Sequence, residues 1–174
     1  MFTLVVGGAS SGKSAYAEAH TLTLDGPRVY LATMRPFGPE GQARVLAHQA
    51  QRRGKGFRTA ERYTNLAAFS LPPASNVLLE CLGNLVANEL FDPDGDGPGC
   101  ALSGVEALLD QCRHLTVVTN EVFSGGIDYQ GDTLAYLREL ARTNRALAAR
   151  ADRVVEVVRS EEHTSELQSP GIIS

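Results

Sequence analysis

Residues 7–14 read Gly-Gly-Ala-Ser-Ser-Gly-Lys-Ser, so that four residues separate Gly7 from Gly12, and a lysine and a serine follow at once. Glycines allow the backbone to curl until successive N–H groups point at one ligand, and a helix start adds partial positive charge. An apolar run at 2–6 precedes the motif and a helix-forming run follows it, which is the setting that a phosphate-binding loop requires. An ordinary glycine-rich turn is the alternative, but the Lys-Ser pair at this spacing favours binding of a nucleoside triphosphate.

The motif assigns roles to individual residues. Lys13 is expected to reach the β- and γ-phosphates and to act in catalysis, and the Ser14 hydroxyl to coordinate Mg²⁺. The phosphate-binding residues predicted from the motif are Gly7, Gly8, Ala9, Ser10, Ser11, Gly12, Lys13 and Ser14.

Apolar runs and helical patterns alternate along the rest of the chain. This alternation predicts an α/β, P-loop NTPase-like (RecA-like) fold, in which a mainly parallel sheet has helices on both faces. The chain has 174 residues and no repeat, and a single nucleotide-binding domain is expected over 1–158. The expected strands are 2–6, 28–32, 76–80, 115–120 and 153–158, and the expected helices are 13–23, 40–52, 82–91, 104–113 and 132–149.

The composition argues against several classes of protein. A net charge of −4 is unlike that of a general nucleic-acid-binding protein. Cys81, Cys100 and Cys112 form no CxxC pair, which favours reduced thiols over disulfides or a zinc site. No apolar run approaches the roughly 20 residues of a membrane span, and the first apolar run leads into the phosphate loop rather than resembling a signal peptide. We therefore expect a cytoplasmic protein without nucleic-acid partners.

The end of the chain differs from the rest. Residues 159–169 read Arg-Ser-Glu-Glu-His-Thr-Ser-Glu-Leu-Gln-Ser and have no convincing strand or helix period. They resemble the in-frame translation of a common short-read sequencing adapter, although a genuine polar tail is the alternative. We treat 159–174 as a non-native tail, expect no packed strand in it, and assign no function to His163.

A second group of polar residues lies in the expected helix at 40–52. Residues four apart stack on one face of a helix, so Arg44, His48 and Arg52 should form a stripe. The residues expected to turn elsewhere for packing are Val45, Leu46 and Ala50. Guanidinium groups bind phosphate oxygens, and a histidine can attack phosphorus and hold the transferred group covalently. A solvated basic face with a bystander histidine is the alternative that these residues alone would favour.

Several short motifs occur together in one order along residues 1–158. On these motifs the chain resembles the bifunctional adenosylcobinamide kinase/adenosylcobinamide-phosphate guanylyltransferase family. Besides the phosphate loop, they are Tyr30-Leu31-Ala32-Thr33-Met34, Arg44-Val45-x-x-His48-x-x-x-Arg52, Thr59-Ala60-Glu61, Leu78-Leu79-Glu80-Cys81-Leu82, Thr119-Asn120-Glu121-Val122 and Asn144-x-x-Leu147-Ala148-x-x-Ala151-Asp152.

The resemblance implies two reactions that use Mg²⁺. A nucleoside triphosphate, ATP or GTP, phosphorylates adenosylcobinamide, and GTP then transfers GMP through a histidine to adenosylcobinamide phosphate. The family resemblance also implies a homo-oligomer, a trimer, with the nucleotide site near a subunit boundary. By motif position, His48 is the residue that holds GMP. The further nucleotide-binding residues implied are Ala32, Thr33, Met34, Gln49, Ala50, Gln51, Arg52, Glu61 and Glu80.

Two acidic residues have open roles at this stage. Glu80 could accept hydrogen bonds from guanine or belong to the metal shell, and strand carboxyl ends are where open α/β sheets bind ligands. Glu121 ends another expected strand and could face either Mg²⁺ or the acceptor. Residues 123–129 depart from the family pattern, which leaves the corrinoid contacts of that loop open.

Two other functions fit the phosphate loop. The first is a small-molecule kinase without guanylyl transfer, in which GTP leaves no covalent mark. The second is a GTP-binding regulatory module, which would turn over no cobinamide and would expose an apolar patch for a partner.

Overall fold

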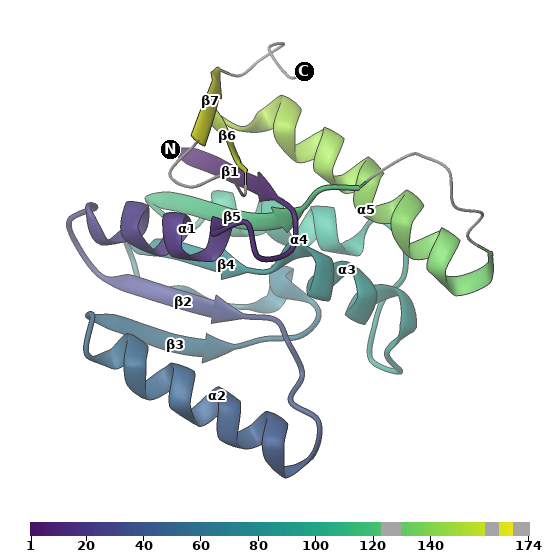
Figure 1. Cartoon of the computed structure of the whole chain (residues 1–174), viewed down its shortest axis with the longest axis horizontal. Coiled ribbons are helices and arrows are strands. Elements are labelled where there is room, and N and C mark those ends of the chain that lie inside the picture. Colours follow the sequence, from purple (N-terminus) through teal and green to yellow (C-terminus); the bar gives the residue numbers. More distant parts are fainter. Residues whose placement is uncertain (123–129, 159–163, 169–174) are drawn as a thin grey trace.

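The computed structural model describes residues 1–122 and 130–158 and, as backbone, residues 164–168. Its centre is a twisted sheet that crosses the molecule (Figure 1). The strands are β1 (Phe2–Gly7), β2 (Arg28–Ala32), β3 (Phe57–Glu61), β4 (Asn76–Glu80), β5 (His114–Asn120), β6 (Arg153–Val157) and β7 (Thr164–Gln168). They lie in the order β3-β2-β4-β5-β1-β6-β7, and β1 to β6 are all parallel.

Helices cover both faces of the sheet (Figure 1). They are α1 (Lys13–Leu22), α2 (Gly38–Arg53), α3 (Leu82–Phe91), α4 (Cys100–Leu109) and α5 (Gly131–Arg150), with a short 3₁₀ turn at Leu66–Ala68. Helix α1 packs against one face of the central strands, while α3, α4 and α5 pack together on the other. Helix α2 packs against the edge strand β3. The predicted α/β architecture is confirmed. No helix in the described ranges is long and apolar enough to cross a membrane.

The alternation of side chains along the strands divides the core in two. On the α1 face, Val5, Tyr30, Leu78 and Val118 pack together. The opposite face is larger, with leucines and valines of α3, α4 and α5 against the sheet. This face has the larger cluster of buried apolar residues, and α3, α4 and α5 keep water from it.

Parallel strands all end at one edge of the sheet, and the register fixes which residues lie side by side there. Ala32 is paired with Glu61 on one side and with Glu80 on the other. Gly7 is paired with Asn120. Because successive residues alternate between faces, Glu61, Ala32 and Glu80 present their side chains on the same face, the one that α1 covers.

Three expectations about elements were wrong. Strand β3 was not expected, because only Phe57 of its five residues is buried and the run therefore shows no apolar block. Helix α4 begins at Cys100 rather than at residue 104. The residue before it, Gly99, is in the left-handed region with a φ of 86°, and the loop ends there.

The third correction concerns the tail. Thr164–Gln168 forms β7, which pairs antiparallel with β6 from Val157 to Arg153, so the expectation of no packed strand after Val158 was wrong. Backbone pairing needs no particular side chains, which is why the polar sequence gave no signal of it. The non-native origin of 159–174 stays a prediction.

Candidate nucleotide site

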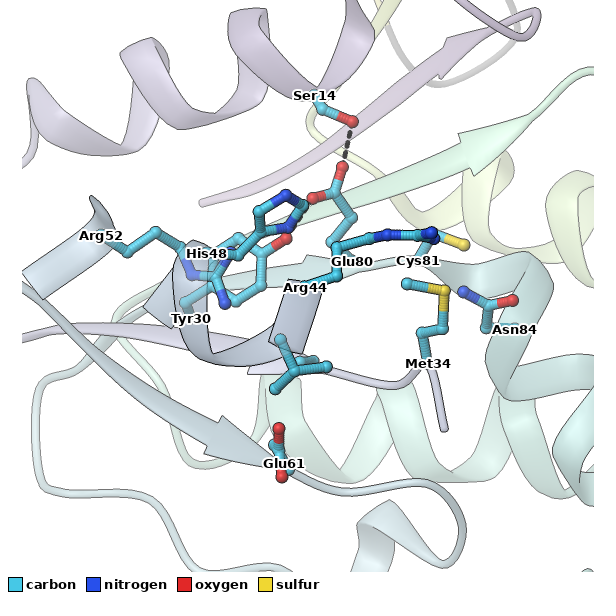
Figure 2. Close-up of a pocket in the computed structure, with 12 residues that line it drawn as sticks. Ser14, Tyr30, Met34, Arg44, His48, Arg52, Glu61, Glu80, Cys81 and Asn84 are labelled. Atoms are coloured by element: carbon cyan, nitrogen blue, oxygen red, sulfur yellow. Dashed lines mark hydrogen bonds between the residues drawn. The ribbon is translucent and has the colours of Figure 1, made fainter. Parts of the chain in front are cut away.

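A pocket of about 310 Å³ lies at the carboxyl edge of the sheet, between β2, β3, β4 and α2 (Figure 2). Its floor is made by the strand ends, with Tyr30, Ala32, Glu61 and Glu80. One wall is α2, which contributes Arg44, Val45, His48 and Arg52. Ser14 closes the end beside the phosphate loop, and Met34, Cys81 and Asn84 complete the lining.

The phosphate loop has the geometry that its glycines predict. Gly12 immediately precedes α1 with a φ of 92°, in the left-handed region that glycine adopts at little cost. A Cβ on Gly7 would lie 2.5 Å from Ser11 Oγ and 2.8 Å from the Val157 carbonyl oxygen, so only glycine fits there. Lys13 Nζ donates to the Gly8 carbonyl oxygen at 2.9 Å, which holds the ammonium over the loop. The loop is thus shaped for an anion at the start of α1.

The Glu80 carboxylate is held by two hydroxyl donors. Ser14 Oγ donates to Glu80 Oε1 (Figure 2). Tyr30 OH donates to Glu80 Oε2. A serine hydroxyl and a carboxylate are oxygen ligands of the kind that Mg²⁺ prefers, and they meet beside the phosphate loop. The structure therefore places Glu80 on the phosphate side of the pocket.

The basic stripe predicted on α2 faces the pocket. Arg44, His48 and Arg52 all line it, and Figure 2 shows them beside Tyr30 and Glu80. The guanidinium of Arg52 lies 3.6 Å from the centre of the Tyr30 ring, a cation–π contact that holds Arg52 at 8% exposure. Two guanidiniums and an imidazole in one cavity can bind phosphate oxygens around a nucleophile.

The expectation that Val45, Leu46 and Ala50 turn away from the stripe for packing was wrong, and Ala50 is exposed. Val45 lines the pocket, and Leu46 is 63% exposed. The physical reason is that α2 packs along the edge strand β3, so little of its surface is covered.

Hydrogen bonds to Cys81 and Asn88 hold the segment that follows β2. Thr33 is fully buried, and its Oγ1 both donates to the Cys81 carbonyl oxygen at 2.8 Å and accepts from the Cys81 N–H at 2.9 Å. Asn88 Nδ2 donates to the Thr33 carbonyl oxygen at 2.8 Å. Of the three residues expected to bind nucleotide here, Ala32 and Met34 line the pocket, whereas Thr33 holds the backbone between them.

The far end of the pocket is bounded by Glu61. Its carboxylate accepts from Gln49 Nε2 at 3.0 Å and from Tyr63 OH at 3.2 Å. Gln49 therefore reaches the site through Glu61, while Ala50 and Gln51 are exposed on α2 and do not line the pocket.

Glu121 and Cys81 both lie near the pocket, but they contribute to it differently. The Glu121 N–H donates to the Gly7 carbonyl oxygen at 3.2 Å, so its backbone braces the phosphate loop, and its side chain does not line the pocket. Cys81 lines the pocket, but burial raises the pKa of its thiol above the ordinary range, which disfavours the nucleophilic thiolate.

Tyr30 and Asn84 are site residues that sequence reasoning did not identify. Tyr30 precedes Ala32 by two positions, and side chains two apart in a strand point to the same face of the sheet. The sequence could therefore have placed Tyr30 beside Ala32. Asn84 lies in the first turn of α3, and its position depends on the end of β4.

Comparison with known proteins gives a consistent result. The pattern of the family described as cobinamide kinase / cobinamide phosphate guanyltransferase matches residues 3–162. The bifunctional adenosylcobalamin biosynthesis protein CobU of Escherichia coli K12 is 36% identical over 91% of this chain and 96% of its own length. CobU of Salmonella typhimurium LT2 has the same identity and coverage, and CobP of Pseudomonas aeruginosa PAO1 is 32% identical over 91% of this chain and 93% of its own.

A solved structure supports the fold. An ATPase from the type III secretion system of pathogenic bacteria aligns with a TM-score of 0.51 over 91% of this chain and 51% of its own. At 12% identity this likeness concerns the fold alone, and it confirms the P-loop NTPase-like arrangement expected from the sequence.

Proposed function

The chain belongs to the cobinamide kinase / cobinamide phosphate guanyltransferase family, and from this premise we propose how its pocket serves the two reactions. It is an adenosylcobalamin-biosynthesis enzyme, a kinase and a nucleotidyltransferase that uses ATP or GTP. We propose that both reactions use the one pocket at the carboxyl edge of the sheet. The observation that supports this most is that Ser14, the last residue of the phosphate-loop motif, lines one cavity together with Glu80 and the α2 stripe that carries His48.

The phosphate loop and Lys13 bind the triphosphate in both reactions. Lys13 already lies over the loop through its bond to the Gly8 carbonyl oxygen, at 2.9 Å, and can exchange this acceptor for a phosphate oxygen. Ser14 and Glu80 would hold Mg²⁺, because their oxygens meet at the mouth of the loop. When bound there, the ion neutralises phosphate charge. In the kinase reaction the adenosylcobinamide hydroxyl attacks the γ-phosphorus, and the nucleoside diphosphate leaves.

His48 acts as the nucleophile of guanylyl transfer. An imidazole nitrogen attacks the α-phosphorus of GTP, a P–N bond forms, and the α–β phosphoanhydride bond breaks with departure of pyrophosphate. A phosphate oxygen of adenosylcobinamide phosphate then attacks the same phosphorus, and the P–N bond breaks to give adenosyl-GDP-cobinamide. Arg44 and Arg52 flank His48 in the pocket and stabilise the negative charge on the transferred group.

Glu61 faces the guanine base, and Glu80 faces the metal and phosphates. The two carboxylates end strands on either side of β2, so two strand spacings, about 10 Å, separate their backbones. This separation suits a ligand that has phosphates at one end and a base at the other. Gln49 orients Glu61 through its hydrogen bond of 3.0 Å, and Ala32 and Met34 lie beneath the nucleotide.

We further propose a cytoplasmic homo-oligomer, a trimer by family resemblance. Phe37 and Leu46 are large apolar side chains at the start and middle of α2, exposed at 81% and 63%, and burial between subunits would place the pocket near a boundary. The three cysteines are free, as in a reducing compartment. Sedimentation of the purified protein tests this, and a monomer at micromolar concentration would contradict it.

The function is tested by incubating the protein with adenosylcobinamide, Mg²⁺ and either ATP or GTP, and following the corrinoids by mass spectrometry. Both nucleotides should yield adenosylcobinamide phosphate, and GTP alone should carry the reaction on to adenosyl-GDP-cobinamide. A phosphorylated product that never proceeds with GTP would indicate a kinase without guanylyl transfer. Absence of both products would indicate a nucleotide-binding module without this activity.

A further inference from the structure

Tyr30 occupies the middle of the pocket floor, between the phosphate side and the α2 wall. It is 8% exposed, and its ring packs edge-on against Phe57, with centroids 6.2 Å apart and an interplanar angle of 88°. Its hydroxyl and its ring face two different functional groups. The hydroxyl donates to Glu80 Oε2, and the ring lies under the Arg52 guanidinium at 3.6 Å.

The contact with Glu80 fixes the direction of a carboxylate. Because Tyr30 holds Oε2, the other oxygen, Oε1, is directed at the Ser14 hydroxyl beside the phosphate loop. The Tyr30 phenol is the donor in this contact. The hydroxyl thus supports the oxygen pair that would hold Mg²⁺.

The contact with Arg52 fixes the direction of a cation. Arg52 Nε is buried without a hydrogen-bond partner among the described residues, so the flat face of the ring is the support the structure gives this guanidinium. Stacking on an aromatic face leaves the edges of a guanidinium free for phosphate oxygens. Arg52 lies one helical turn from His48, on the same face of α2.

We propose that Tyr30 is a positioning residue with two separable parts: its hydroxyl orients Glu80 for the metal and triphosphate, and its ring holds Arg52 for guanylyl transfer at His48. The proposal rests on the proposed function of the pocket. It also explains why an aromatic residue with a hydroxyl lies here, since Phe supplies only the ring contact and Leu supplies neither.

The test compares Tyr30→Phe with Tyr30→Leu, and Tyr16→Phe is the matched control. Tyr16 packs against the same apolar cluster from α1 but does not line the pocket. The first readout is the affinity for a non-hydrolysable GTP analogue by calorimetry, with Mg²⁺ and with EDTA. The second is the single-turnover rate of covalent GMP attachment at saturating GTP.

Tyr30→Phe should bind the analogue about tenfold more weakly with Mg²⁺, the scale of one hydrogen bond to a charged group, and equally well in EDTA. Its GMP attachment rate at saturation should stay within about threefold of the wild-type rate. Tyr30→Leu should lose a further factor of about ten in that rate, the scale of a cation–π contact out of water. Arg52→Lys keeps the charge but not the planar stack, so it should lower the rate in the same way and serves if Tyr30→Leu does not fold.

Tyr30→Phe binding as tightly as wild type with Mg²⁺, or equally weakened in EDTA, would overturn the role of the hydroxyl. Equal GMP rates for Tyr30→Phe, Tyr30→Leu and Arg52→Lys would overturn the role of the ring. If the wild-type protein forms no covalent GMP, the proposed function fails, and the binding arm then tests the Tyr30–Glu80 contact by itself.

Discussion

Replacing Glu80 by Gln tests which end of the nucleotide this carboxylate faces. Glutamine keeps one oxygen that can accept a hydrogen bond, but its NH₂ group cannot accept, so either Ser14 or Tyr30 loses its acceptor. The negative charge beside the phosphate loop is lost as well. A hydrogen bond to a charged group contributes about 1.5–3 kcal/mol, and we take the lower end because the Ser14 contact is exposed. We therefore expect affinity to fall by a factor of about ten or more.

The loss should be the same for ATP and GTP, because the phosphates and Mg²⁺ are common to both. Equilibrium binding of non-hydrolysable analogues, measured with Mg²⁺ and again with EDTA, gives the four affinities required. Glu61→Gln is the matched control, since it makes the same change at the far end of the pocket and should weaken GTP more than ATP. A Glu80→Gln variant that loses affinity for GTP alone would refute the assignment to the metal side and place guanine at Glu80.

Three further predictions follow from the site and the sheet. Lys13→Ala should lower kcat/KM of both reactions at least about 100-fold, since loss of a charge stabiliser in a pocket costs about 2.7–4 kcal/mol, and near-native activity in either reaction would require a second nucleotide site. Burial raises the pKa of Cys81, so its thiolate is depleted at about pH 8, and iodoacetamide should label it more slowly in the folded protein than in urea; equal rates would contradict the buried thiol. Deleting 159–174 should leave nucleotide affinity unchanged, because β7 lies at the opposite edge of the sheet from β3 and the pocket; a tenfold loss on titration would contradict this.

The elements that could be read from the sequence are those whose residues are buried on both faces. β4 is buried from Asn76 to Leu79 and β5 from Leu115 to Thr119, and each gave a clear apolar run. Strand β3 has no apolar run, because it is packed against a single helix and Phe57 is its only buried residue. Pairing of β7 depends on the open edge of β6, a property of the fold rather than of residues 164–168.

The parts of the site that could be predicted are those whose residues are consecutive in the chain or lie four apart along a helix. The phosphate loop and the stripe of Arg44, His48 and Arg52 are local patterns, and in the structure the stripe and Ser14 at the end of the loop line one pocket. The contacts among Tyr30, Glu80 and Arg52 could not be read in this way, because they depend on how α2 packs beside β2 and β4. The ambiguity of Glu80 had the same origin, since only the packing of α1 brings Ser14 to its carboxylate.

The central claim is that His48 holds GMP in the pocket formed with the phosphate loop. The most direct measurement is incubation of the protein with Mg²⁺ and α-labelled GTP, followed by digestion and mass mapping of the labelled peptide, with γ-labelled GTP and His48→Ala as controls. We predict an acid-labile, base-stable GMP adduct on His48 from the α-label, none from the γ-label, and none in His48→Ala, which should still phosphorylate adenosylcobinamide. Covalent GMP that persists in His48→Ala, or maps to another residue, would contradict the account.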